Sequence, residues 1–362
     1  MKIGILTFHC AINYGAVLQA YGLQEYLKSL GHEVYIIDYR PDYLITPYRL
    51  FFSEAAKGRG LLGNIRFFVR ELLAVPIRYK RRKAFQRFIK TYLHLAKMDF
   101  QSENNDYDCF VFGSDQVWNP QITGGDSVFF GDAPCFKGKR MITYAASAGN
   151  ASTLKEIDAA CLKGWLSNFS AISVREKSLS HYLTEELQLN NQLVLDPVLL
   201  AGKDIFHKIA SSKINEKPYL LFFSLQKNDE ALQLARRFAK KERLELIEMY
   251  SAEEVVKNKK VLQCLSPEEF VGMFKGAKYV VSTSFHGTVF SILFYKPFIC
   301  SCYNCGNSRF HSLLDMLGLQ ERLMEVSPIK ELNLTDINWS LVDEIIFQNR
   351  KKSSSFIENT LN

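Results

Sequence analysis

The stretch that decides the fold runs from residue 2 to residue 38 and reads KIGILTFHCAINYGAVLQAYGLQEYLKSLGHEVYIID. KIGILTF is an apolar run of the kind expected for a parallel strand buried on both faces. Apolar residues then recur near helical spacing (Val17, Leu18, Tyr21, Leu27 and Leu30), and a glycine, Gly31, ends the helix. HEVYIID is the next strand. We therefore predict a β–loop–α–β unit with a right-handed crossover.

The same alternation returns in the second half of the chain. PYLLFFSL is an apolar strand, and a helix over 229–242 and the strand LELIEM follow. SPEEFVGMFKGA begins a helix with Ser266 as N-cap, a proline at the first helical position and Glu269 three residues after the cap, which is a capping box. The strand KYVVST, a helix over 287–295 and the strand PFIC complete the pattern.

A chain of 362 residues suits two domains better than one, since domains usually hold about 100–200 residues. We place the first domain at 1–203, with a basic helical insertion at 57–95, and the second at 214–330. The polar, patternless segment 201–217 is the predicted linker. A helix in the C-terminal segment 336–362 can cross back to the first domain. The predicted fold class is α/β, with two Rossmann-like parallel sheets that face an interdomain cleft.

The N-terminus has one lysine, a short apolar run and no small-residue cleavage site, so it predicts a first strand and not a signal peptide. No stretch reaches the roughly 18 apolar residues of a membrane span. The longest candidate, residues 289–300, is interrupted by Lys296 and Pro297. We expect a cytoplasmic protein.

Residues 57–90 differ from the rest of the chain in charge. They hold eleven basic residues and one acid, Glu71, a net charge of +10 against +7 for the whole chain. Helical spacing of the apolar residues, broken at Pro76, predicts two helices. These form either a solvated lid on the first domain or an amphipathic surface that contacts anionic lipid at the inner face of the membrane. Nucleic-acid binding is disfavoured because no recognition motif accompanies the charge.

Most of the eight cysteines lie in apolar runs, where a thiol behaves as a small hydrophobe. The exception is CSCYNC, which holds Cys300, Cys302 and Cys305. With His311 these could supply four zinc ligands, but the paired clusters typical of a zinc site are missing. We favour reduced thiols and predict no metal. No nicotinamide, flavin or cluster motif is present either, so we expect no cofactor.

Polar residues follow the first predicted strand, at the carboxyl end where ligands bind in open α/β sheets. His9, Asn13 and Gly15 come before a helix whose N-terminus would favour an anion. Gly15 would let a ligand approach the backbone closely. The alternative is a turn that needs Gly and Asn for its own geometry. No GxGxxG dinucleotide fingerprint is present.

Two further strands end in polar side chains. The strand over 109–112 leads into GSDQVWNP, where Ser114 and Asp115 can hydrogen-bond and Trp118 can stack on a sugar face. An Asx-turn above a core tryptophan is the alternative. Arg175 closes the strand AISV, where it can bind a carboxylate or phosphate through two parallel hydrogen bonds. A salt bridge to a surface acid would explain it as well.

His286 lies in STSFHGTVFSILF, between a buried strand and a buried helix. An anion bound at the helix start would touch Ser284, His286 and the amides of Gly287 and Thr288, which should lack partners within the helix. Histidine can also exchange a proton near neutral pH. The alternative is a core histidine with satisfied hydrogen bonds.

Six segments appear in an order that resembles the polysaccharide pyruvyl transferase family: NYGAVLQAYGLQEYLKSLGHEVYIIDYRP, FGSDQVWNP, YAASAG, SVREKS, VLDPVLL and STSFHGTVFSILFYKPFI. The resemblance covers roughly residues 1–318. It implies a GT-B-like fold, with an acceptor-binding first domain and a donor-binding second domain. It also implies transfer of the pyruvyl group of phosphoenolpyruvate onto a sugar of an exopolysaccharide, capsule or cell-wall saccharide, as a cyclic ketal. The acceptor would be a saccharide, in some cases a lipid-linked one.

The family associates an arginine–X–histidine motif with phosphoenolpyruvate. The histidine maps onto His286, but Ser284 replaces the arginine. Arg175 matches another family arginine and becomes the expected carboxylate clamp. We take His286 as the general acid or the ligand of the leaving phosphate, and Asp115 as the base for a sugar hydroxyl.

Two rival functions fit the same fold. A glycosyltransferase would need a nucleotide-sugar site with an acid that binds the ribose, and Glu268, Glu269 and Asp315 do not follow a predicted strand. A non-catalytic binding protein is the second rival, and the serine at position 284 is its support. Thermal stabilisation by phosphoenolpyruvate would favour pyruvyl transfer, and stabilisation by a nucleoside diphosphate would favour the glycosyltransferase. A phosphate-release assay with phosphoenolpyruvate and hexosides would distinguish the enzyme from the binding protein.

Overall fold

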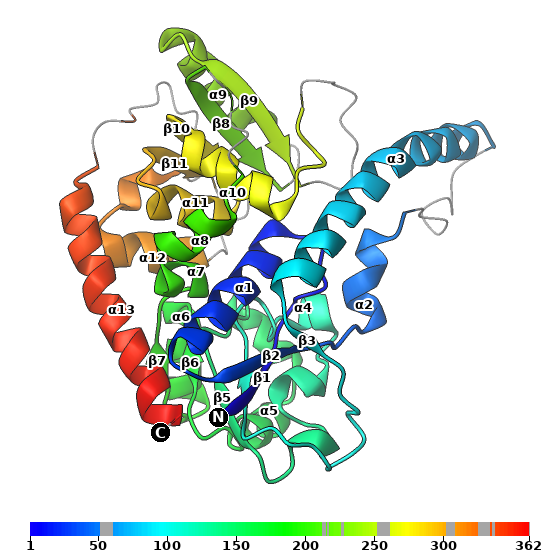
Figure 1. The fold of residues 1–362 in the computed structure, drawn as a ribbon, viewed down its shortest axis with the longest axis vertical. Coiled ribbons are helices and arrows are strands. Elements are labelled where there is room, and N and C mark those ends of the chain that lie inside the picture. Colours follow the sequence, from blue (N-terminus) through cyan, green and yellow to red (C-terminus); the bar gives the residue numbers. More distant parts are fainter. Residues whose placement is uncertain are drawn as a thin grey trace.

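Two parallel β-sheets, one in each half of the chain, form the frame of the molecule (Figure 1). The computed structural model describes residues 1–50, 61–211, 215, 217–225, 228–251, 261–301, 308–324, 334 and 337–361. Within these residues, every pairing between the strands of either sheet is parallel.

The first sheet has the strand order β3-β2-β1-β4-β5. Its strands are β1 (Lys2–Leu6), β2 (Glu33–Ile37), β3 (Leu95–Ala96), β4 (Cys109–Phe112) and β5 (Arg140–Thr143). A short parallel pair, β6 (Ser173–Val174) and β7 (Gln192–Leu193), adjoins β5 through isolated bridges. The helices of this half are α1 (Tyr14–Ser29), α2 (Asp42–Ile45), α3 (Leu61–Tyr92), α4 (Pro120–Thr123), α5 (Ala159–Leu166), α6 (Lys177–His181) and α7 (Pro197–Ala201).

The second sheet has the order β12-β11-β10-β8-β9. Its strands are β8 (Tyr219–Ser224), β9 (Glu245–Tyr250), β10 (Tyr279–Ser282), β11 (Phe298–Ser301) and β12 (Leu323–Met324). The helices described in this half are α9 (Asp229–Lys241), α10 (Pro267–Gly276), α11 (Phe285–Leu293) and α12 (Ser308–Leu317). The predicted capping box opens α10, with Ser266 and Glu269 each bonded to the other's backbone N–H.

Both strand orders belong to doubly wound α/β folds. The first sheet has the Rossmann order 3-2-1-4-5, and the second has the order 2-1-3-4-5 when its strands are counted from β8. The prediction of two Rossmann-like parallel sheets is therefore confirmed. The strand order reverses at one point in each sheet, between β1 and β4 in the first and between β8 and β10 in the second. The chain segments that leave the carboxyl ends of these strands are where a ligand is expected.

The two halves share an apolar core in addition to their own cores. Tyr14, in the first turn of α1, stacks on Phe270 of α10 with ring centroids 4.3 Å apart. The Tyr14 hydroxyl donates to the Leu265 carbonyl across the same boundary, at 2.8 Å. Aromatic pairs of this kind contribute about 0.5–1.5 kcal/mol beyond area burial, so this contact fixes how the halves sit against each other.

The last helix, α13 (Trp339–Leu361), runs from the second half back along the first (Figure 1). Tyr26 of α1 donates to its Ser354 hydroxyl at 2.7 Å. Near its end, Arg140 donates to the carbonyls of Thr360 and Leu361. The C-terminal helix thus packs on the domain that begins the chain.

Two predicted elements differ in the structure. The basic segment, from residue 61, where the described residues resume, forms one helix, α3, with Pro76 inside it, and not two helices. Proline removes one backbone hydrogen bond at a cost of about 3 kcal/mol, which packing on both sides can offset. The segment predicted as a patternless linker contains the helix α8 (Lys203–Ile209). It buries Phe206 and Ile209, a pair too short to give a helical pattern in sequence.

Among the described residues, no helix combines the length and the apolar character that crossing a bilayer requires. The longest helix, α3, has 32 residues but carries a basic residue in almost every turn of its second half.

Candidate functional site

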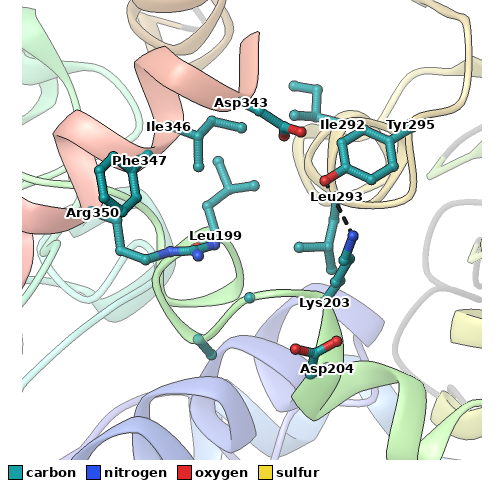
Figure 2. Close-up of a pocket in the computed structure, with 12 residues that line it drawn as sticks. Leu199, Lys203, Asp204, Ile292, Leu293, Tyr295, Asp343, Ile346, Phe347 and Arg350 are labelled. Carbon is teal, nitrogen blue, oxygen red and sulfur yellow. Dashed lines mark hydrogen bonds between the residues drawn. The ribbon is translucent and has the colours of Figure 1, made fainter. Parts of the chain in front are cut away.

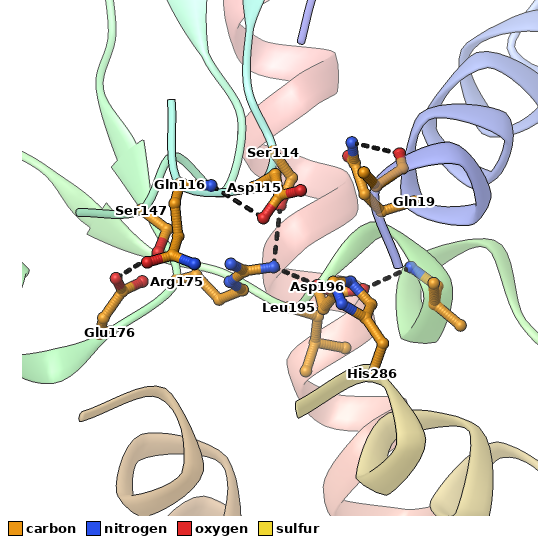
Figure 3. Close-up of polar contacts among 12 residues, drawn as sticks. Gln19, Ser114, Asp115, Gln116, Ser147, Arg175, Glu176, Leu195, Asp196 and His286 are labelled. Atoms are coloured by element: carbon orange, nitrogen blue, oxygen red, sulfur yellow. Dashed lines mark hydrogen bonds and ion pairs between the residues drawn. The ribbon is translucent and has the colours of Figure 1, made fainter. Parts of the chain in front are cut away.

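The side chains of Arg175 and His286, from the two halves of the chain, meet at the carboxylate of Asp196 (Figure 3). Arg175 follows β6, Asp196 follows β7, and His286 lies in the first turn of α11. Asp196 Oδ2 is 2.6 Å from Arg175 Nη1 and 3.5 Å from His286 Nε2. The sequence placed Arg175 and His286 at strand ends, and the structure brings them together across the domain boundary.

Asp196 is held in place by the start of α7. Its Oδ1 accepts a hydrogen bond from the Val198 amide at 2.9 Å, which makes it the N-cap of that helix. The neighbouring Leu195 amide donates to Ser353 of α13 at 3.0 Å. With Oδ1 used for the cap, Oδ2 is left to face Arg175 and His286.

Charge compensation dominates this buried cluster. Burial alone would raise the pKa of the Asp196 carboxyl, but attraction to His286 and Arg175 and its hydrogen bonds hold that pKa well below its usual range. Burial disfavours the charged form of Arg175, yet the nearby carboxylates of Asp196, Glu176 and Asp115 raise its pKa. Arg175 and Asp196 are therefore a permanently charged pair inside the protein.

One edge of the Arg175 guanidinium has no hydrogen-bond partner among the described residues. Nη1 donates to Asp196 and, at 3.3 Å, to Ser114 Oγ, while Nε and Nη2 are buried and unpaired. Nε and Nη2 form the fork that binds a carboxylate or phosphate bidentately. His286 Nε2 also makes no hydrogen bond, because 3.5 Å to Asp196 is too long and poorly aligned for one. Buried unpaired donors are costly, so these atoms indicate a site for an anion.

Gly15 supports the His286 ring. A Cβ added to Gly15 would lie 2.1 Å from His286 Nδ1, which is well inside van der Waals contact. The glycine at the start of α1 is therefore needed for the close approach of an imidazole from the other half of the chain. The sequence suggested that Gly15 makes room for a ligand, whereas in the structure it makes room for His286.

The start of α11 is more fully satisfied than predicted. Ser284 is the N-cap, and its hydroxyl accepts from the Gly287 amide at 3.4 Å. The Thr288 amide donates to the Ser284 carbonyl at 3.0 Å. The expectation that both amides lack partners is wrong, because the helix begins at Phe285, two residues earlier than predicted. The cap bond to Gly287 is long, and an anion could replace it at little cost.

Ser114 and Asp115 border the same cluster from the loop after β4 (Figure 3). Asp115 has a left-handed backbone (φ 70°), which aspartate tolerates better than most residues. Its Oδ1 accepts from the Gln116 amide at 2.9 Å, and its carboxylate faces the Arg175 guanidinium. This loop therefore adds a hydroxyl that accepts from Arg175 Nη1 and a second carboxylate near the guanidinium.

Three residues of this region were not singled out from the sequence. Asp196 was interpreted only as the residue that ends a strand. Glu176 is fully buried, with Oε1 bonded to Ser147 and to the amides of Ala148 and Gly149, while Oε2 is unpaired among the described residues. Burial, opposed by Arg175, raises its pKa. Arg309 lies 5.4 Å from the Phe285 ring, which Arg175 approaches to 4.8 Å. No local pattern marks these residues, because their partners are distant in sequence.

Two predicted site residues lie near β1 with other roles. His9 is buried, with Nδ1 3.2 Å from the Thr7 carbonyl and Nε2 2.8 Å from Asp38 Oδ1. The hydrogen bond between His9 and Asp38 is the main cause that lowers the pKa of Asp38 to about 2. Asn13 is the N-cap of α1, and its Oδ1 accepts from the amides of Gly15 and Ala16. The expected anion position at this helix start is therefore occupied by the asparagine oxygen.

Trp118 is a core residue. Its ring has no exposed surface, its Nε1–H donates to the Phe129 carbonyl at 3.0 Å, and it stacks on Phe130. The prediction that Trp118 stacks on a sugar is wrong. The alternative, an aspartate turn above a core tryptophan, describes its position.

The cysteine cluster lies mostly outside the described residues, which include neither Cys302 nor Cys305. Cys300 is buried, and its thiol donates to the Arg322 carbonyl at 3.4 Å. Within the described ranges, no three His, Cys, Asp or Glu side chains are grouped in a way that could hold a metal ion.

A separate cavity of about 310 Å³ lies at the other end of α11, between α7, α8 and α13 (Figure 2). Its polar lining includes Lys203, Asp204, Asp343 and Arg350. Arg350 is already bonded to the Leu199 carbonyl through Nε and Nη2. This cavity therefore lacks the unpaired fork that marks the Arg175 cluster.

Comparisons with known structures give low sequence identity over nearly whole chains. The UDP-GlcNAc 2-epimerase of Methanocaldococcus jannaschii is 11% identical, with 96% of this chain and 92% of that chain covered and a TM-score of 0.46. A glycosyltransferase of Streptomyces sp. SF2575 is 12% identical, with coverage of 98% and 95% and a TM-score of 0.38. A sequence comparison with curated proteins gave no match.

The comparison with protein families is decisive for this chain. The family model described as polysaccharide pyruvyl transferase matches residues 13–304, a span that includes Arg175, Asp196 and His286. It extends from the N-cap of α1 past the end of β11 and so covers strands of both sheets, with β1 and β12 outside the span. The chain therefore belongs to the polysaccharide pyruvyl transferase family.

Proposed function

We propose that this protein transfers the pyruvyl group of phosphoenolpyruvate onto two hydroxyls of a saccharide, as a cyclic ketal. Membership of the family implies a saccharide acceptor, and an exopolysaccharide, capsule or cell-wall saccharide is the proposed class. The single observation that carries the proposal is the buried, unpaired Nε–Nη2 edge of Arg175 beside His286. A small dianion with a carboxylate and a phosphate matches that pair of groups.

In this proposal Arg175 takes the place of the family arginine that is missing at position 284. Its fork binds the phosphoenolpyruvate carboxylate, and Asp196 holds the guanidinium in orientation from the opposite edge. Ser284 is left to cap α11. The Asp196 carboxylate also lies where it can stabilise an imidazolium at His286.

The proposed reaction needs one acid and one base. His286 donates a proton to the methylene carbon of phosphoenolpyruvate, and the first sugar hydroxyl bonds to the neighbouring carbon as Asp115 takes its proton. The bond between that same carbon and the phosphate oxygen then breaks, and Asp115 returns a proton to the leaving phosphate. The second hydroxyl closes the ring and gives its proton back to His286. A positioned general acid typically contributes 10²–10⁴-fold to the rate.

The first test is a ligand-stability screen. We expect phosphoenolpyruvate to raise the thermal midpoint and nucleoside diphosphates to leave it unchanged. Stabilisation by a nucleoside diphosphate alone would instead support glycosyl transfer. Stabilisation by neither, with no phosphate release across a panel of hexosides, would support a non-catalytic binding protein.

The second test replaces Arg175 by lysine, which keeps the charge but removes the fork. A lost charged hydrogen bond contributes about 1.5–3 kcal/mol, so phosphoenolpyruvate affinity should fall by about 10- to 100-fold. Arg87→Lys, an exposed arginine on α3, is the matched control and should leave the affinity unchanged. Equal affinity in Arg175→Lys and the native protein would remove Arg175 from the site.

A further inference from the structure

The helix α3 has two halves with different surroundings. Its second half lies against the body of the molecule, with Phe85 and Phe88 fully buried. Its first half extends away from the body (Figure 1). Only one side of the helix is turned inward along its length, the side of Phe67, Ala74, Arg81 and Phe85. The opposite side is exposed from end to end.

The exposed side of the first half is apolar. Six of the eleven large apolar side chains exposed in the described residues belong to this one helix: Ile65 (52%), Phe68 (44%), Val69 (53%), Leu72 (68%), Leu73 (57%) and Tyr79 (54%). Positions 65, 69, 72, 76 and 79 are three to four residues apart and so follow a single stripe, with Phe68 and Leu73 beside it. Large apolar side chains gathered on a projecting helix mark an interaction surface.

The same stripe becomes basic in the second half. Lys80, Lys83, Arg87 and Lys90 are all exposed and continue the three-to-four-residue spacing from Pro76. The one acidic residue of the helix, Glu71, faces inward and pairs with Arg78 at 2.6 Å. Along its exposed side, α3 therefore carries an apolar stripe for about four turns, with the exposed Arg66 and Arg70 beside it, and is then cationic for about three turns, by helix geometry.

We propose that this side of α3, from Ile65 to Lys90, docks on an anionic lipid surface. The apolar half enters the headgroup and acyl boundary, and the basic half binds lipid phosphates, as in interfacial amphipathic helices. Charge selects this occupant. A protein partner would need a long surface that changes from apolar to acidic, and a second copy aligned in parallel would place the basic row against itself.

The docked helix also holds both halves of the protein. Arg81 Nη2 donates to the Ile12 carbonyl of the first half at 2.8 Å, and its two Nη atoms bond to Ser251 of the second half at 2.7 and 2.8 Å. Cys264, also in the second half, donates to the Ile77 carbonyl. Lipid docking through α3 would therefore present the domain boundary to the surface. The consequence for a lipid-linked acceptor rests on the proposed function, whereas the docking itself does not.

The experiment is sedimentation of the full chain with vesicles of neutral lipid, or of neutral lipid with about one-third anionic lipid, at about 50 mM salt, where screening is weak. We expect binding to the anionic vesicles and little binding to the neutral ones. Leu72→Glu should lower the partition coefficient roughly tenfold or more, because it places a charge in the apolar half. The double variant Lys80→Gln and Lys83→Gln should lower it about 25-fold, at about fivefold for each charge near the surface.

Matched controls lie on α13. Leu341→Glu changes another exposed leucine (52%), and Lys351→Gln with Lys352→Gln removes two exposed charges; both should bind like the native chain. Absence of binding at low salt, or equal losses in the controls, would overturn the proposal. So would the loss of an oligomer in Leu72→Glu, measured by sedimentation velocity, in place of a loss of lipid binding. Phosphoenolpyruvate affinity, measured on the same variants, should not change, which separates this proposal from the proposed function.

Discussion

Gly15→Ala is the perturbation that tests the site most directly. An added Cβ would lie 2.1 Å from His286 Nδ1, whereas ordinary contact begins at 3.4 Å, so the ring must move by about 1.3 Å. A displacement of about 1 Å at a catalytic group can lower a rate about 10²-fold. In an ordinary helix the same change would stabilise the protein by up to about 1 kcal/mol. A loss of rate or stability in Gly15→Ala, in place of a gain in stability, would therefore show that the contact between Gly15 and His286 matters.

The assay is phosphate release from phosphoenolpyruvate with a panel of acceptor hexosides. We expect Gly15→Ala to reduce the rate about 100-fold in the native background and to have little further effect in His286→Ala, because the clash is then absent. Gly164→Ala is the control, since it lies on the exposed side of α5 with nothing near its Cβ position. Histidine-labelled spectra should show a changed His286 environment in Gly15→Ala alone.

A full 100-fold loss in both backgrounds would refute the reasoning, because Gly15 would then act independently of His286. Native activity in Gly15→Ala would refute it as well. Loss of folding does not account for a specific effect if the thermal midpoint of Gly15→Ala stays near that of Gly164→Ala. The comparison of four variants thus isolates one contact between the two halves of the chain.

Three other predictions follow from the structure. The lowered pKa values of Asp38 and Asp196 contribute stability that is complete above about pH 4. This stability is lost as the pH falls through the folded pKa values, about 2 for Asp38. Asp38→Asn should therefore flatten the acid limb of unfolding followed by circular dichroism. Trp118→Phe should lower the free energy of unfolding by about 2 kcal/mol through lost packing and a lost indole hydrogen bond, with no change in acceptor KM; a raised KM at native stability would contradict its core position. Asp196→Asn should cost about 3–5 kcal/mol by leaving Arg175 uncompensated, and Arg175→Met added to it should recover most of that loss in chemical denaturation. No recovery in the double variant would mean that the cost comes from the helix cap and not from the charge.

Local patterns predicted the frame of the fold well. The strand β4 has the predicted bounds, and the capping box of α10 makes both of its hydrogen bonds. These features depend on residues within a few positions of each other, so their energetics are visible in sequence. The doubly wound architecture followed because parallel strands buried on both faces read as continuous apolar runs.

Features set by tertiary contacts were not visible. A single helix through Pro76 depends on the packing around it, and the helix α8 depends on the burial of Phe206 and Ile209. The role of Asp196 depends on partners 21 positions before it and 90 positions after it, and its sequence context indicated only the end of a strand. Gly15 was singled out correctly but for a different neighbour. The sequence thus identified strand-end residues without showing which of them share a contact.

The unpaired fork of Arg175 links stability to function in this protein. A structural ion pair would be expected to use all its donors, because each buried unpaired donor costs about 1–3 kcal/mol. Here one edge of the guanidinium is satisfied by Asp196 and Ser114, and the other edge is left unsatisfied next to an imidazole that makes no hydrogen bond. These atoms come from both halves of the chain and belong to one buried cluster. Under the proposed function, an anion bound there would satisfy donors from both halves at once and so stabilise the contact between them.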